Sequence, residues 1–128
     1  ALAGCGALKS TARDMAKYAT AVIDAENGTD GPLADAIRLS TQVQIKASKP
    51  FEPDMCLGWL RLRDKETGVP IFHHDGGTGG SSSALFICPQ QHFAVFALAN
   101  TQTTLWTSVR QIMADPMGML SGLIENAA

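Results

Sequence analysis

Two apolar runs near residue 90 constrain the fold more than any other feature of the sequence. Residues 84–88 and 92–99 consist almost entirely of apolar side chains, and only Pro89, Gln90 and Gln91 separate them. Short runs in which consecutive residues are apolar are typical of strands that are buried on both faces. Such a sheet needs cover on both sides, so the sequence predicts an α+β fold in which helices flank an antiparallel sheet.

A hairpin is predicted immediately before these runs. Apolar and polar residues alternate from Leu57 to Arg63, and the next residues, 65–68, have the composition of a turn. The chain is then expected to return as a strand from Val69 to His74. Together with the two apolar runs, this hairpin gives an antiparallel sheet of about four strands between residues 57 and 100.

In the first third of the chain, apolar residues recur with the spacing of a helix and not with that of a strand. Thr11 and Asp14 fit a capping box at the start of one helix, and Asn27-Gly28 is expected to end it. Pro32 fits the first position of a second helix, which would end near Ser40. The apolar residues expected to share one face of this second helix are Leu33, Ala36, Ile37 and Leu39. We therefore predict one domain over residues 1–128, with helices within 10–40, a linker over 41–56, strands over 57–100 and a C-terminal helix over 103–126.

Composition excludes several classes of function. Ten Lys and Arg residues against twelve Asp and Glu residues give a net charge of −2, which is too small to indicate a nucleic-acid partner. No apolar stretch is long enough to span a membrane. The three cysteines are widely spaced, so they indicate neither a disulfide framework nor a zinc site. We expect no metal and no other cofactor.

Residues 74–80, His-Asp-Gly-Gly-Thr-Gly-Gly, form the stretch most typical of ligand binding. Glycines allow a ligand to approach backbone N–H groups closely. The residues alone fit a solvated histidine in a glycine-rich hairpin equally well. A zinc site built on His73 and His74 is disfavoured, because adjacent strand residues point to opposite faces. Residues 81–83 are serines outside any GxSxG elbow, and they are expected to bond the loop backbone.

Four segments of the chain occur in the order known from one enzyme family. They are residues 3–15 (AGCGALKSTARDM), Leu57-Gly58-Trp59, His74-Asp75-Gly76 and Leu98-Ala99-Asn100. In this order they resemble the AGGL-STA-D, GLGW, His-x-Gly and LAN segments of the serine β-lactamase and penicillin-binding-protein-like family, which includes class C β-lactamases and related esterases. The resemblance covers about residues 3–100 and implies part of a β-lactamase/transpeptidase-like fold.

The resemblance also implies a reaction and a set of roles. Members hydrolyse small-molecule amide or ester substrates through an acyl-enzyme. His74 matches the basic residue of the third motif, which places a substrate carboxylate or assists proton transfer. The backbone N–H of Gly77 matches an oxyanion-hole donor, so His74 and Gly77 are the expected catalytic residues. Asp75, Gly76 and Thr78 are the expected substrate-binding residues.

Two other motifs of the family are absent from this sequence. No serine is followed by lysine three positions later, and the only tyrosine, Tyr18, lies within a predicted helix. We therefore expect the C-terminal portion of a hydrolase, inactive alone, whose missing N-terminal portion supplies the nucleophile. Asp75 replaces the usual small or hydroxylated residue, so a close match to true β-lactamases is in doubt. The family implies a periplasmic or secreted location, although residues 1–8 do not read as a signal peptide.

Two alternatives stay open at this point. The chain could be a truncated remnant without catalysis, which acts as a structural or binding module and forms a homodimer through exposed sheet or helix surface. It could also be an independent enzyme that uses His73, His74 and Asp75 in another way.

Overall fold

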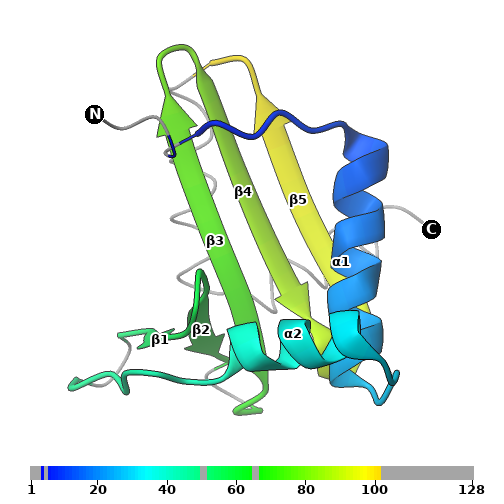
Figure 1. The fold of residues 1–128 in the computed structure, drawn as a ribbon. Coiled ribbons are helices and arrows are strands. Elements are labelled where there is room, and N and C mark those ends of the chain that lie inside the picture. The colour runs from blue at the N-terminus through cyan, green and yellow to red at the C-terminus, as the bar shows by residue number, and fades with distance from the viewer. Residues whose placement is uncertain (1–3, 5, 50–51, 65–66, 102–128) are drawn as a thin grey trace.

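The computed structural model describes residues 4, 6–49, 52–64 and 67–101. Two helices, α1 (Ala12–Glu26) and α2 (Pro32–Thr41), precede a five-stranded antiparallel sheet (Figure 1). This confirms the predicted α+β class, with one strand more than expected. The predicted C-terminal helix over 103–126 lies outside the described residues.

The limits of α1 follow from its sequence as predicted. The hydroxyl oxygen of Thr11 accepts a hydrogen bond from the backbone N–H of Asp14 at 3.2 Å, which satisfies one of the unpaired donors at the helix start. At the other end Asn27 caps the helix, and its side-chain amide also donates to the carbonyl of Pro89 at 2.9 Å. This bond ties the end of α1 to the sheet.

The apolar face predicted for α2 was wrong. The described chain buries Ala34 and Thr41 and partly buries Ile37, whereas Leu33 and Leu39 are 69% and 54% exposed. The buried Thr41 hydroxyl donates to the carboxylate of Glu26 at 2.6 Å, which links the ends of the two helices. The side of α2 that faces the protein is therefore made by Ala34, Thr41 and Ile37, which packs against the first core, and not by its two leucines.

The sheet is a meander in which each strand pairs with its neighbours in sequence. The strands are β1 (Asp54–Met55), β2 (Leu60–Arg63), β3 (Pro70–Thr78), β4 (Ser81–Cys88) and β5 (Phe93–Ala99), and a 3₁₀ turn, η1 (Pro89–Gln91), joins the last two. β1 was not predicted, since its two residues fall within the expected linker. It pairs with β2 through Met55 and Leu60, so the segment expected to begin a strand at Leu57 instead makes the turn before β2.

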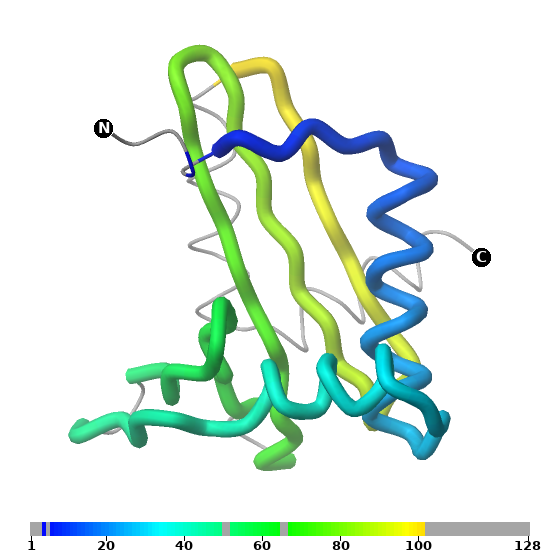
Figure 2. The backbone as a smooth tube through the Cα atoms, in the orientation of Figure 1, coloured from blue at the N-terminus to red at the C-terminus, as the bar shows by residue number. Residues whose placement is uncertain are grey.

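Side chains of the sheet divide between two faces. The first face packs against α1, with a core of Ala19, Val22, Cys56, Trp59, Phe72, Leu85 and Ile87. The second face holds Leu62, Ile71, Ala84, Phe86 and Cys88. Both helices lie on the same side of the sheet, with α1 alongside β5 and α2 across the other end of the strands from the β3–β4 turn (Figures 1 and 2). Of the two predicted apolar runs, β4 is buried on both faces, whereas β5 is the last strand in order and only half-buried.

Candidate functional site

The strand that was expected to end at His74 continues through the first two glycines of the glycine-rich stretch. β3 continues to Thr78, and its residues 76–78 pair with Ser83, Ser82 and Ser81 of β4 in that order. The turn consists of Gly79 and Gly80, and Gly80 has a φ of +88° that favours glycine. The three serines, predicted to bond a loop backbone, therefore lie within β4.

One edge of this strand extension is open among the described residues. β2 pairs with β3 only as far as the contact between Leu60 and His73. From His74 to Thr78, β3 pairs only with β4 within the described chain. An unpaired strand edge presents a row of backbone N–H and C=O groups that can bind another molecule.

Antiparallel alternation decides which amides face the open edge. The backbone N–H of Asp64 donates to the carbonyl of Val69 at 2.9 Å, so Val69 directs its own polar backbone groups toward β2. Every second residue of an antiparallel strand faces the same neighbour. Continuing in steps of two from Val69 along β3 leads to Gly77. The N–H of Gly77 therefore points outward from the open edge, whereas Gly76 faces β4.

The two adjacent histidines lie on opposite faces of the sheet, as strand alternation predicted. His74 is exposed on the first face, beyond the position of Phe72. His73 is 1% exposed on the second face, where its ring stacks on Phe86 with centroids 4.2 Å apart. The pair therefore does not converge on one ligand.

The contacts of His73 favour one tautomer of its ring. Its Nδ1 lies 3.2 Å from the carbonyl oxygen of Leu85, and because a carbonyl only accepts, Nδ1 carries the proton. Burial lowers the pKa of His73, while the Leu85 carbonyl and Asp75 oppose that effect. The Nε2 atom lies 3.9 Å from a carboxylate oxygen of Asp75, so the side chain of Asp75 belongs to the second face and not to the face of His74.

A groove of about 830 Å³ lies at the open end of β3. Its walls are the N-terminal segment (Gly4, Gly6, Leu8, Lys9, Ser10), residues 74–78 of β3, residues 81–83 of β4, and residues 98–100 at the end of β5. All five predicted site residues, His74, Asp75, Gly76, Gly77 and Thr78, therefore line one groove. Sequence reasoning missed the serines and Asn100 as lining residues. The places of the serines opposite residues 76–78 follow once the pairing register is known, and Asn100 directly follows the end of β5.

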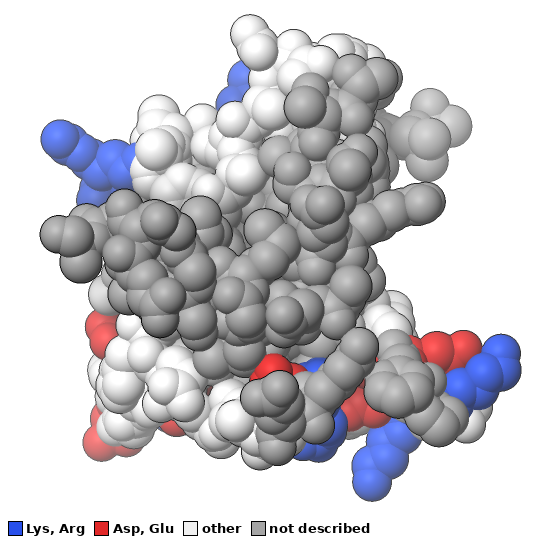
Figure 3. Space-filling model, turned by 180° about the vertical axis from the view of Figure 1, so that it is seen from behind, with Lys and Arg blue, Asp and Glu red and all other residues white. Residues whose placement is uncertain are grey.

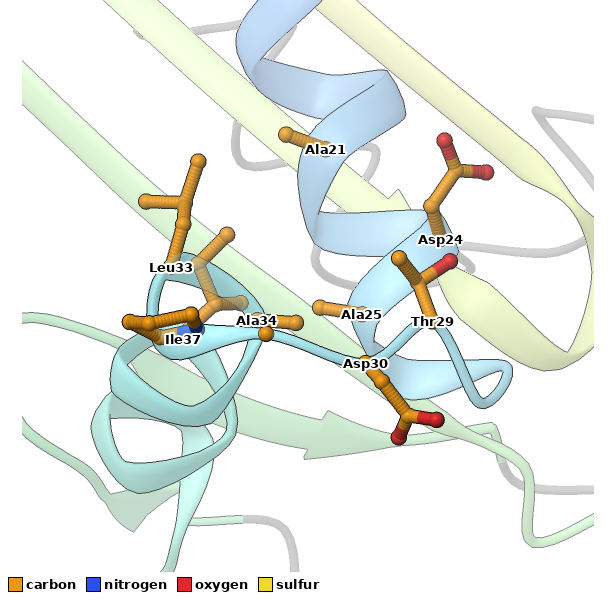
Figure 4. A pocket seen from close by; sticks show the side chains of 10 residues that line it. Ala21, Asp24, Ala25, Thr29, Asp30, Leu33, Ala34 and Ile37 are labelled. Atoms are coloured by element: carbon orange, nitrogen blue, oxygen red, sulfur yellow. The ribbon is translucent and has the colours of Figure 1, made fainter.

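A second hollow lies between the two helices and offers less chemistry. It measures about 360 Å³, and alanines, Leu33 and Ile37 line it with Asp24 and Asp30 at its rim (Figure 4). Its ten lining residues include no histidine, serine, cysteine or lysine. The groove beside β3 is therefore the candidate site.

Two charged residues, Lys9 and Asp75, line the groove itself. Seen from behind, charged side chains of the described residues gather at the end that holds β1 and β2, and the described atoms near the β3–β4 turn are mostly uncharged (Figure 3). The charged end includes the ion pair between Arg61 and Asp54 at 2.8 Å. No described group of three or more His, Cys, Asp or Glu residues could hold a metal ion, and none of the described helices is long and apolar enough to cross a membrane.

Comparison with known proteins identifies the family of this chain. Residues 2–115 match the family model described as Beta-lactamase. The chain belongs to the Beta-lactamase family. Among curated proteins it is similar to two fungal relatives. Unguisins hydrolase ungD' of Aspergillus campestris is 29% identical over 100 residues, which are 78% of this chain and 19% of that protein. Unguisins hydrolase ungD of Aspergillus violaceofuscus is 27% identical over 119 residues, covering 80% of this chain and 21% of that protein.

Membership of the Beta-lactamase family confirms the resemblance drawn from the four segments. The chain spans about a fifth of the length of these curated relatives, so the similarity covers only a part of each of them. The matched range includes both the groove and the segment that precedes α1.

Proposed function

We propose that this chain forms one wall of the reaction cleft of a serine hydrolase that cleaves amide or ester bonds through an acyl-enzyme. The observation that carries the proposal is the outward N–H of Gly77 on an open strand edge, next to the exposed His74. The nucleophile and its base would come from the portion of the hydrolase that precedes this chain.

Gly77 would act in this cleft as one donor of the oxyanion hole. Attack on an ester or amide carbonyl moves negative charge onto the carbonyl oxygen, and an amide already aimed at that oxygen stabilises it. Such a donor contributes about 3 kcal/mol to transition-state stabilisation. A glycine suits this position because it leaves the substrate free to approach the backbone.

His74 would hold the substrate beside this donor. Its side chain lies on the groove face of β3, one strand position beyond the point where β2 ends. An imidazole there can donate to a substrate carboxylate or transfer a proton near the leaving group. Thr78 and Gly76 lie on the same face and would line the bound substrate, whereas Asp75 would act through its backbone at the open edge.

Replacement of Gly77 by proline tests the oxyanion role directly. Proline removes the N–H, and at an unpaired edge it breaks no ladder hydrogen bond. In the protein made from the complete reading frame, with hydrolysis of p-nitrophenyl acetate and nitrocefin as the assays, Gly77→Pro should lower kcat by about 10²–10³-fold. Circular dichroism should show an unchanged fold.

Gly79→Pro is the matched control for this experiment. Gly79 precedes Gly80 in the β3–β4 turn, has open space around it, and occupies a position where β-turns accept proline. This variant should retain activity. Equal loss in both variants would contradict the role of the Gly77 amide. A stable homodimer that hydrolyses neither substrate would favour the non-catalytic alternative.

A further inference from the structure

The N-terminal segment lies against the end of β3 at one point of unusually close packing. Gly6 has a φ of +69°, a backbone conformation that residues with side chains rarely adopt. A Cβ atom at this position would also collide with the methyl group of Thr78. Backbone conformation and space therefore each require glycine at position 6.

This contact fixes where the following residues lie. Leu8, Lys9 and Ser10 line the groove directly after Gly6, and the segment then enters α1 through the Thr11 cap. The segment is thus held at both ends, by Thr78 on one side and by the helix on the other. It passes in front of the sheet between β3 and α1 (Figure 2).

Apolar side chains on two sides of the groove are open to solvent. Leu8 is 96% exposed on the N-terminal segment, and Leu98 is 45% exposed on β5. Alternation from Phe96 places Leu98 on the first face of the sheet, the same face as His74. A groove of about 830 Å³ is within the usual range for small-molecule sites, and apolar lining gives such sites most of their affinity.

We propose that residues 6–10 form a specificity-determining wall that selects substrates with a medium-length apolar acyl chain, and that Gly6 is the residue that positions this wall. The inference rests on the proposed hydrolase function, because the acyl chain would extend from a carbonyl bound at Gly77. Leu8 and Leu98 would be buried by the chain, whereas an acetyl group would reach neither.

The test compares p-nitrophenyl octanoate with p-nitrophenyl acetate, using the protein made from the complete reading frame. Gly6→Ala should displace the wall and lower the octanoate-to-acetate ratio of kcat/KM by about tenfold. Gly68→Ala is the matched control, since Gly68 has a φ of +71°, nothing within 4 Å of an added Cβ, and a place at the opposite end of β3. This control should leave the ratio unchanged.

A double variant separates the collision from the backbone strain. Thr78→Ser removes the colliding methyl, and the nearest remaining atoms of residue 78 would lie 3.6 and 3.9 Å from the added Cβ. Gly6→Ala combined with Thr78→Ser should therefore recover part of the ratio lost in Gly6→Ala, since the strain of the positive φ remains. A double variant whose ratio is no higher than that of Gly6→Ala would contradict the assigned role of the contact.

Leu8→Ser keeps the inference testable if Gly6→Ala does not fold. Leu8 is almost fully exposed, so this change should leave stability unaffected and still lower the ratio by about tenfold. Calorimetric titration with octanoate gives a readout that needs no turnover: wild type should bind it and Leu8→Ser should bind it more weakly. Turnover with an unchanged ratio in Leu8→Ser would overturn this inference alone, as would equal octanoate binding by both proteins. Octanoate binding that depends on Leu8, without hydrolysis of either ester, would instead contradict the proposed function.

Discussion

The two halves of β3 differ in almost every physical respect. Residues 70–73 all pair with β2, Phe72 and His73 also pair with β4, and three consecutive residues, Ile71, Phe72 and His73, are buried. Residues 74–78 pair on one side within the described chain, include two consecutive glycines, and line a groove. The first half stabilises the fold, and the second half leaves backbone groups available to a substrate. One strand can do both because the neighbouring strand β2 ends at its midpoint.

Truncation of a side chain in the buried half should have the largest effect. Phe72 contacts Trp59 edge to face in the first core, with ring centroids 6.3 Å apart. Phe72→Ala should lower the free energy of unfolding by about 4 kcal/mol, because it removes buried apolar surface and leaves a cavity. Urea unfolding followed by circular dichroism measures this loss.

His74→Ala, two residues along the same face, is the control for that comparison. The side chain of His74 is exposed, so the free energy of unfolding should change by no more than about 0.5 kcal/mol. If the two variants lost similar stability, the division of β3 into a structural and a functional half would be wrong.

The pH dependence of stability should show the effect of burying His73 in the first half of β3. Burial lowers the pKa of His73 below its ordinary value of 6.5, so the unfolded chain binds a proton that the folded protein excludes. The free energy of unfolding should therefore fall as the pH drops below about 6.5, and level off below the folded-state pKa. One proton limits the slope to about 1.4 kcal/mol per pH unit.

Urea unfolding between pH 5 and 7.5 measures this slope. His73→Phe should flatten it, because phenylalanine keeps the stack on Phe86 and cannot bind a proton. An unchanged slope in His73→Phe would mean that another group accounts for the pH dependence.

The smallest expected effect on stability concerns Thr11, which caps α1 directly after the wall of residues 6–10. Thr11→Ala removes the side-chain acceptor for the Asp14 N–H and should lower the free energy of unfolding by about 1 kcal/mol. Thermal melts measure this loss, and Thr11→Ser, which keeps the hydroxyl, should leave the free energy of unfolding nearly unchanged in them. A loss well above that of an ordinary cap would indicate that the open end of the sheet depends on this segment for stability.

Local chemistry made much of the fold predictable from the sequence. The Thr11 cap, the Asn27-Gly28 stop and the run around Phe86 each depend on neighbours within a few residues, and each lies where predicted. β1 has no such local pattern, because its two residues become a strand only through pairing with β2 and the bridge to Ile45. The exposed Leu33 shows the same limit, since packing against α1 decides which side of α2 is buried.

The candidate site was predicted as a set of residues but not as a geometry. The glycines marked the place, and alternation separated His73 from His74. Glycine composition, however, indicates a loop, and only the register with residues 81–83 shows that Gly76 and Gly77 are strand residues. The contact between Gly6 and Thr78 joins positions that are far apart in sequence, so no local pattern could reveal it.

The meander order of the sheet also governs how the chain reaches this structure. Because every strand pairs with its immediate successor, the described hairpins close through short connections at a low cost in chain entropy. The docking of α1 is the exception, since the bond from Asn27 to Pro89 spans 62 residues. Contacts distant in sequence slow folding, so we expect the docking of α1 onto β4 and β5 to be the slow step in the folding of this architecture.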